Sequence, residues 1–225
     1  MEARPRVGVS GSFAAGALAP FVEVVKLGGD AAGALDGCIV DGPALLQSRD
    51  GAPVCDAAWL GDAVQRDRFF AQLFTHHRLR VALAAAPSPG AVVAAHSDHK
   101  MLYLAHSPVR YRELGRLVAA VGTVPAHEGA SRYRAAAIDA LSETASRGKH
   151  ANVLEHLLGF LKRVLSSPEK REILDVIEAY RLGAHPLARP RALVWERIVR
   201  HGVGGWIARQ VYWEPYPPAL AGLGA

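Results

Sequence analysis

The pattern of apolar residues changes once along the chain, near Cys55, and this change limits the possible folds more than any other feature. Before it, short β-branched runs at Arg6–Ser10, Phe21–Leu27 and Gly37–Val40 are separated by glycine, alanine and proline. Such runs predict three buried strands with short connections, paired in a short parallel sheet. After it, apolar residues recur at helical spacing almost to the end. The pattern predicts a mainly α protein with a small α/β unit at its N-terminus.

The same pattern divides the chain into an α/β unit at residues 1–55, a helical domain at 56–218 and an irregular tail at 219–225. Asp56 is a candidate cap for the first long helix. Ser107–Pro108 and Ser167–Pro168 each predict a helix start, because serine caps well and proline suits the first helical position. The segment Gly122–Gly129 is predicted to be a loop before a helix over about 130–146.

Composition and charge indicate which partners suit such a chain. Half of the residues are apolar and 21% are charged, as in ordinary globular proteins. No apolar run approaches the roughly 18 residues that a bilayer requires, and two cysteines are too few for a disulfide framework. We therefore expect a cytoplasmic protein with no membrane association.

The positive charge is concentrated in the C-terminal half. Residues 145–201 hold eleven lysines and arginines against six acids, an excess that equals the formal net charge of +5 of the whole chain. A basic half is typical of proteins that bind phosphate or another anionic partner. A solvated surface whose charges only aid solubility is the alternative.

Two predicted helices each carry a polar, histidine-containing stripe. The first stripe follows the spacing i, i+3, i+7 and i+10, and the second repeats every three or four residues, so each lies on one helix face. Gly159 within the second stripe is expected to permit close approach of a ligand or a backbone. We call these stripes the first seam (His96, His99, Tyr103 and His106) and the second seam (Lys149, Asn152, His156, Gly159 and Arg163).

Four interpretations of the seams are open. The side chains can simply form hydrogen bonds to neighbouring carbonyls within a helical bundle. They can bind phosphates or a polynucleotide, or act as acids and bases on a small molecule. A metal site is the fourth interpretation, but His96 and His99 have no evident third ligand, so we predict no metal. The catalytic candidates are His99, His106 and His156, and the ligand-binding candidates are His96, Lys100, Tyr103, Arg112, Lys149, His150, Asn152 and Arg163.

A cluster of aromatic residues lies close to the C-terminus, at Trp206, Tyr212, Trp213 and Tyr216. These rings have two plausible roles. They can stack on nucleobases, or they can fasten the C-terminal segment to the helices. The sequence alone favours the second role.

Three segments give the chain a resemblance to a known family. They are HSDHKMLYLAHSPVRYRELGRLVA (96–119), RGKHANVLEHLLGFLKRVLSSPEKREILDVIEAYRLGAHPL (147–187) and ARQVYWEPYP (208–217). In this order they resemble the YbgA-like domain, a helical bacterial family of unknown function. In many relatives this domain follows an α/β domain similar to the thiouracil desulfidases, which hold an iron–sulfur cluster on three cysteines. The resemblance implies that the helical domain presents RNA or a thio-compound to that cluster.

The N-terminal unit departs from the desulfidase pattern. Gly11–Ser12 stands where those proteins have Ala-Cys, and GPALL (42–46) replaces their Ser-Pro-Ser-Cys-Gly motif. Two scattered cysteines do not replace three. We interpret the unit as a shortened, cluster-free remnant of the desulfidase domain and expect no cofactor in the purified protein.

These observations lead to two candidate functions. The first is binding of RNA or a nucleotide-like anionic ligand through the two seams. The second is a metal-free enzyme of a biosynthetic pathway that uses histidine acid–base chemistry on a small molecule. A scaffolding module is a third alternative. A site shared by the seams requires His99 or His106 to approach His156 or Asn152 across one cavity.

Overall fold

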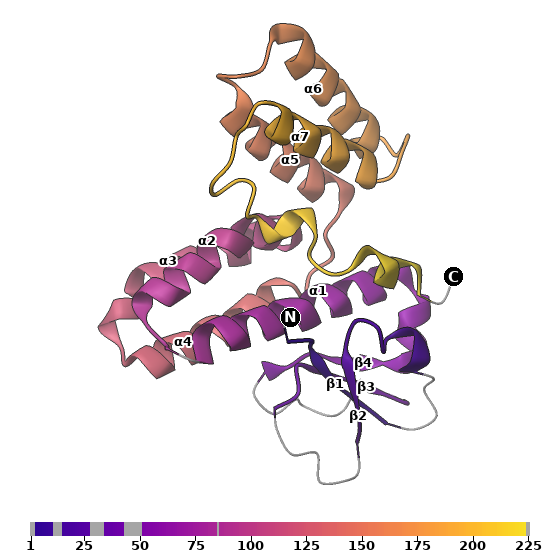
Figure 1. Cartoon of the computed structure of the whole chain (residues 1–225), viewed down its shortest axis with the longest axis vertical. Coiled ribbons are helices and arrows are strands. Elements are labelled where there is room, and N and C mark those ends of the chain that lie inside the picture. The colour runs from indigo at the N-terminus through magenta and orange to yellow at the C-terminus, as the bar shows by residue number, and fades with distance from the viewer. Residues whose placement is uncertain (1–2, 11–14, 28–33, 43–50, 85, 224–225) are drawn as a thin grey trace.

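The computed structural model describes residues 3–10, 15–27, 34–42, 51–84 and 86–223. Its N-terminal part is a small sheet, and the rest is mainly helical (Figure 1). The strands are β1 (Arg6–Val9), β2 (Glu23–Lys26), β3 (Gly37–Val40) and β4 (Val54–Asp56). The α-helices are α1 (Ala63–Ala84), α2 (Pro89–His106), α3 (Pro108–Ala120), α4 (Ala126–Ala140), α5 (Arg147–Leu161), α6 (Ser167–Arg181) and α7 (Ala188–Arg200).

The sheet is parallel throughout, with the strand order β2-β1-β3-β4. The predicted fold class is therefore confirmed, but two details of the prediction were wrong. The sheet contains a fourth strand, β4, whose three residues are too few to show a periodic pattern. Strand β2 lies at the edge and is largely exposed, whereas β1 and β3 are buried.

Helix α1 connects the sheet to the helical part. Its residues Phe69, Phe70 and Leu73 pack with the strands in one buried cluster. Asp56 caps a short 3-10 helix, η3 (Ala57–Gly61), rather than α1 itself. The side chain of Asp62 accepts the backbone hydrogen bonds at the start of α1 instead. Asp56 is therefore a helix cap, as predicted, but it caps η3 and not the first long helix.

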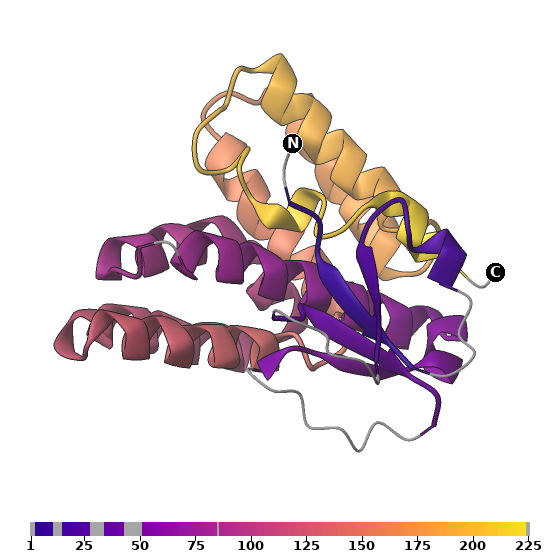
Figure 2. The ribbon, with the colours of Figure 1, turned by 60° about the horizontal axis from the view of Figure 1, so that its bottom comes forward.

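The remaining helices form two further buried clusters. Helices α2, α3 and α4 pack with the C-terminal half of α1, and α2 and α4 run side by side in both views (Figures 1 and 2). Helices α5, α6 and α7 pack around leucines of α5 and the end of α2. Helix α4 begins at Ala126, inside the predicted loop, and ends at Ala140 rather than near residue 146.

The C-terminal segment returns across the molecule from α7 to α1 (Figure 1). Tyr216 and Leu220 are buried in the cluster formed by the sheet and α1. Residues Pro218–Gly222 form a 3-10 helix, η6, within the predicted tail. Arg66 of α1 donates hydrogen bonds to the carbonyl of Ala221 at 3.0 and 2.7 Å. These contacts hold the C-terminal segment against the helix that also packs on the sheet.

The two cysteines lie on adjacent strands, Cys38 in β3 and Cys55 in β4. Burial raises the pKa of both thiols, that of Cys55 to about 12. The two thiols are fewer than the three cysteines that hold the cluster of the desulfidases, so these residues do not fit such a cluster. Gly11–Ser12 and residues 43–46 of the GPALL segment lie outside the described residues.

No helix among the described residues is both long and apolar enough to cross a bilayer.

Candidate functional site

A polar cleft of about 370 Å³ opens where α1, α2, α5 and α6 meet. Helix α2 ends at His106, and α5 begins at Arg147 after the N-cap Ser146, so both ends face α1. A narrow inner extension of about 40 Å³ continues toward Arg191 and Tyr212. The polar residues that line the cleft or its extension are Asp67, Arg68, His106, Glu143, Thr144, Arg147, His150, Tyr180, Arg191 and Tyr212.

His106 is held in one orientation at the cleft. Its Nδ1 lies 2.8 Å from the carbonyl oxygen of Glu143. Because a carbonyl only accepts, Nδ1 carries the proton of the neutral ring, and Nε2 is left as a hydrogen-bond acceptor. Burial lowers the pKa of His106, although the bond to Glu143 opposes the shift. The ring is therefore neutral at neutral pH.

His150 lies across the cleft from α1 and is equally uncharged. Its Nδ1 is 3.1 Å from the hydroxyl of Tyr212, and its ring packs against those of Tyr180 and Tyr212. Burial, with the nearby His106 and Arg191, lowers the pKa of His150 to about 3. A group with so low a pKa is a weak general base near neutral pH.

Lys149 lies next to the cleft but has no donor to spare. Its Nζ donates to the carbonyl of His106, to the carboxylate of Glu143 at 3.0 Å and to the carbonyl of Thr144 at 3.1 Å. An ammonium group has three donors, so all are used. Ser107 donates to the other carboxylate oxygen of Glu143. Lys149 therefore has a structural role, because it holds Glu143, which lines the cleft.

Three arginines supply positive charge to the cleft. Arg147 donates to the carbonyls of Tyr180 and His185 at 3.0 and 3.2 Å, and Arg191 lies over the ring of Tyr212. Arg68, on α1, is half-buried. Within the described part of the chain, none of these three guanidinium groups is paired with a carboxylate. The carboxylate of Asp67 already accepts a hydrogen bond from Tyr216 at 2.5 Å.

The first seam lies mostly in the core. His99 is buried, with Nδ1 2.8 Å from the carbonyl of Ala95, and its Nε2 has no partner among the described residues. The hydroxyl groups of Tyr103 and Tyr133 are 3.3 Å apart, and His96 stacks on Tyr103. Burial lowers the pKa of both His96 and His99 to about 4. Only His106 of this seam lines the cleft.

Apart from Lys149, the second seam lies on the solvent-facing side of α5 or just after its end at Leu161. Asn152, His156 and Arg163 are exposed, because the apolar face of α5 at Val153, Leu154, Leu157 and Leu161 points inward. His156 and Arg163 line a separate shallow depression of about 580 Å³. His156 lines neither the cleft nor its extension, and neither His99 nor His106 lines the depression, so the prediction of a cavity shared by the seams was wrong.

Three further predicted residues also lie away from the cleft. Lys100 has its Nζ 4.2 Å from the ring centre of Trp206, and Arg112 is exposed on α3. A Cβ placed on Gly159 would meet open space among the described residues, so no backbone approaches this glycine closely. Sequence reasoning missed Asp67, Arg68, Glu143, Arg147, Tyr180 and Arg191. The one signal that could have found some of them is the family resemblance, because Arg147 and Tyr180 lie within its segments and Glu143 and Arg191 lie beside them.

Fold and cleft together define a helical protein that carries a small parallel sheet and a polar cleft at the junction of α1, α2, α5 and α6. The family profile described as "Protein of unknown function (DUF1722)" matches residues 100–217, more than half of the chain, and the chain belongs to this family. It is 29% identical over 155 residues to "Uncharacterized protein YbgA" of Escherichia coli (strain K12). That alignment covers 68% of this chain and 91% of the relative. No solved structure matches significantly.

The comparisons confirm the YbgA-like resemblance predicted from the sequence. The cleft draws a residue from each of the three segments that carried it: His106, His150 and Tyr212. The fold thus brings the recognisable parts of the family sequence together at one place.

Proposed function

We propose that the protein binds a small anionic ligand, such as a phosphate ester, in the polar cleft. The observation that carries this proposal is the set of guanidinium groups at Arg68, Arg147 and Arg191, none paired with a carboxylate among the described residues, around a concave site. Arginine binds phosphate and carboxylate groups through two parallel hydrogen bonds. A volume of about 370 Å³ is in the range of small-molecule pockets.

The two histidines of the cleft add a second requirement on the ligand. His106 offers Nε2 as an acceptor, because its Nδ1 donates to the carbonyl of Glu143. The carboxylate of Asp67 is another acceptor at the same cleft. A ligand that combines an anionic group with N–H or O–H donors satisfies both the arginines and these acceptors. A nucleotide-like molecule has this combination.

The alternatives have less support from the geometry. Binding of RNA by the predicted residues loses Lys149, whose donors are all used, and Tyr103, which is buried. His150 is half-buried and bonded to Tyr212. An enzyme that uses His99, His106 and His156 together would need the three groups within reach of one substrate. His99 lies in the core and His156 lines another depression.

Calorimetric titration with ribose 5-phosphate at low salt tests the proposal. Arg68→Gln removes a guanidinium of the cleft without removing a hydrogen bond within the described structure. We expect it to weaken binding about tenfold or more, since hydrogen bonds to charged groups are worth roughly 1.5–3 kcal/mol. Arg163→Gln, in the second seam, is the matched control and should leave the affinity unchanged.

Filter binding of transfer RNA with the same two variants tests the alternative. If the seams bind RNA, Arg163→Gln should weaken binding and reduce its salt dependence. Transfer RNA binding that depends on Arg163 and not on Arg68, with no binding of ribose 5-phosphate, would contradict the cleft.

A further inference from the structure

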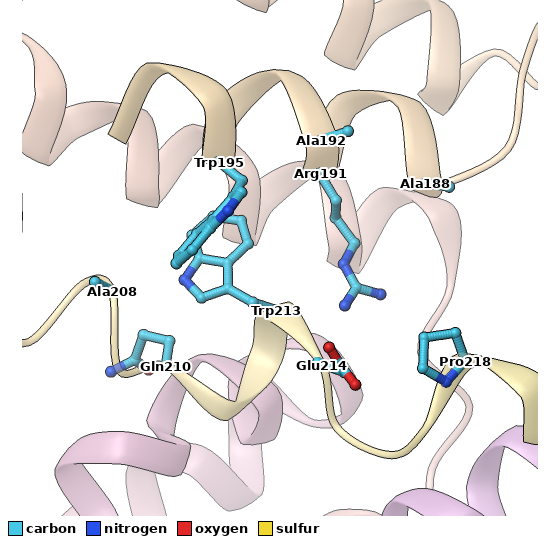
Figure 3. Close-up of a pocket in the computed structure, with 9 residues that line it drawn as sticks. All are labelled: Ala188, Arg191, Ala192, Trp195, Ala208, Gln210, Trp213, Glu214 and Pro218. Atoms are coloured by element: carbon cyan, nitrogen blue, oxygen red, sulfur yellow. The ribbon is translucent and has the colours of Figure 1, made fainter. Parts of the chain in front are cut away.

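Another cavity, of about 600 Å³, lies between α7 and the segment 208–218, and Arg191 lines both this cavity and the inner extension of the cleft (Figure 3). We call it the tryptophan cavity. Ala188, Ala192 and Trp195 recur at helical spacing, so they lie on one face of α7 and line the cavity together with Arg191. The two alanines leave room that larger side chains would fill. The facing wall includes Trp213 and Glu214.

The wall formed by the C-terminal segment is fixed by hydrogen bonds. Trp213 donates its indole N–H to the carbonyl of Ile207 at 2.7 Å. The buried amide of Gln210 donates to the carbonyls of Ser97 and Trp206 and accepts from the backbone N–H of Met101. Trp195 meets Trp213 with ring centres 5.6 Å apart. The aromatic surface is therefore preorganised for a ligand.

Two side chains of opposite charge line this cavity on opposite walls. Figure 3 shows the Arg191 guanidinium and the Glu214 carboxylate both turned toward the space between α7 and the C-terminal segment. Neither group forms an ion pair with any residue that the structure describes. Arg191 also lines the inner extension of the polar cleft. This one side chain therefore borders both cavities.

We propose that the tryptophan cavity holds the planar heteroaromatic ring of a ligand whose phosphate lies in the polar cleft, which makes the ligand a nucleotide. This inference rests on the proposed function, because the phosphate subsite is the cleft. The tryptophans offer faces on which a base stacks, and Glu214 accepts hydrogen bonds from N–H groups of the base, such as the exocyclic amino group of adenine. Arg191 binds the phosphate at the boundary between the two cavities.

Calorimetric titrations with adenosine 5′-monophosphate and ribose 5-phosphate test the inference, because the sugar phosphate has a C1 hydroxyl in place of the base. Trp195→Leu removes one stacking face, and Ala192→Leu fills the cavity while both tryptophans remain. We expect each variant to weaken binding of the nucleotide about tenfold, as the loss of one base–aromatic stack does, and to leave that of the sugar phosphate unchanged. Trp59→Leu is the control, since Trp59 is 41% exposed, as Trp195 is at 39%, and lines neither cavity.

The outcomes separate this inference from the proposed function. Equal affinity of the wild type for the two ligands, or no effect of Trp195→Leu and Ala192→Leu on folded protein, overturns the base subsite and leaves the cleft intact. Nucleotide binding that depends on Trp195 but not on Arg68 supports the base subsite and overturns the cleft. A 5′-phosphorylated oligoribonucleotide, tested with the same variants, shows whether the base and phosphate come from a free nucleotide or from an RNA end.

Discussion

At the residue scale, the most connected charged group is Asp36, which precedes β3 and is fully buried. Arg80 donates two hydrogen bonds to its carboxylate at 2.8 and 2.9 Å, and His76 and His77 lie at 3.4 and 2.9 Å. The backbone N–H of Arg6 is a further donor. Sequence reasoning identified none of this, because the groups are 30 to 44 residues apart from Asp36 and a histidine pair late in a helix already suits the helix dipole.

Replacing Asp36 should therefore strongly destabilise the fold. Burial alone would raise the pKa of Asp36, but the bonds from His76, His77 and Arg80 outweigh it and hold the pKa well below the usual range. Asp36→Asn leaves Arg80 without its partner, so we expect a loss of about 3–5 kcal/mol in the free energy of unfolding. Urea denaturation measures it. Asp175→Asn, at an exposed position of α6, should change it by less than about 0.5 kcal/mol, and equal effects would refute the prediction.

Stability should fall as the pH is lowered through the range in which unfolded histidines gain protons. The buried His99 has a pKa of about 4, below the ordinary 6.5, so the unfolded chain binds more protons between these values. His99 stabilises the fold fully above pH 6.5, and about 3 kcal/mol is lost by pH 4. His99→Leu should flatten the pH dependence of unfolding. His127→Gln, at an exposed position of α4, is the control and should leave the pH dependence of unfolding as it is in the wild type. An unchanged pH dependence in His99→Leu would contradict the role given to His99.

At the element scale, the sequence predicted where helices start, but it did not predict which polar face of a helix is turned to solvent. Serine followed by proline predicted both α3 and α6, although the cap of α6 is Ser166 rather than Ser167. On α5, the polar stripe that contains His156 is simply the solvent face. Its inward polar residue, His150, follows Lys149 of the stripe directly and meets the hydroxyl of Tyr212. A polar stripe looks the same in a sequence whether it faces water or a cleft.

The capping box of α6 gives a test at this scale. The hydroxyl of Ser166 accepts a hydrogen bond from the backbone N–H of Glu169. The carboxylate of Glu169 accepts one from the backbone N–H of Ser166. Ser166→Ala should lower the free energy of unfolding by about 1 kcal/mol. Ser131→Ala, on the exposed face of α4, is the control in the same denaturation experiment. A loss no larger than that of the control would show that the cap does not stabilise α6.

At the scale of the whole molecule, the C-terminal segment joins the sheet, α1 and the helices around the cleft. Leu220 is fully buried against the sheet and α1, whereas Leu182 is 77% exposed. Leu220→Ala should cost about 2–5 kcal/mol, and Leu182→Ala should cost little. Thermal unfolding measures both. Similar midpoints for Leu220→Ala and the wild type would mean that the segment does not contribute to the common core.

The cleft belongs to this same scale, which explains why sequence analysis found it only in part. Asp67, His106, His150 and Tyr212 lie on elements far apart in the chain, and no periodicity relates them. The fold class could be predicted from local patterns, because strands and helices depend mainly on residues that are neighbours in the sequence. His106 and His150 were predicted as site residues, but their arginine neighbours depend on how α1, α5 and α7 pack.

The most direct test of a ligand site in this cleft follows the histidine side-chain nitrogens by NMR during a titration with adenosine 5′-monophosphate. Our account predicts that the Nε2 resonances of His106 and His150 shift to saturation, while those of His99 and His156 stay in place. Shifts confined to His156, or no shift at saturating nucleotide, would contradict it.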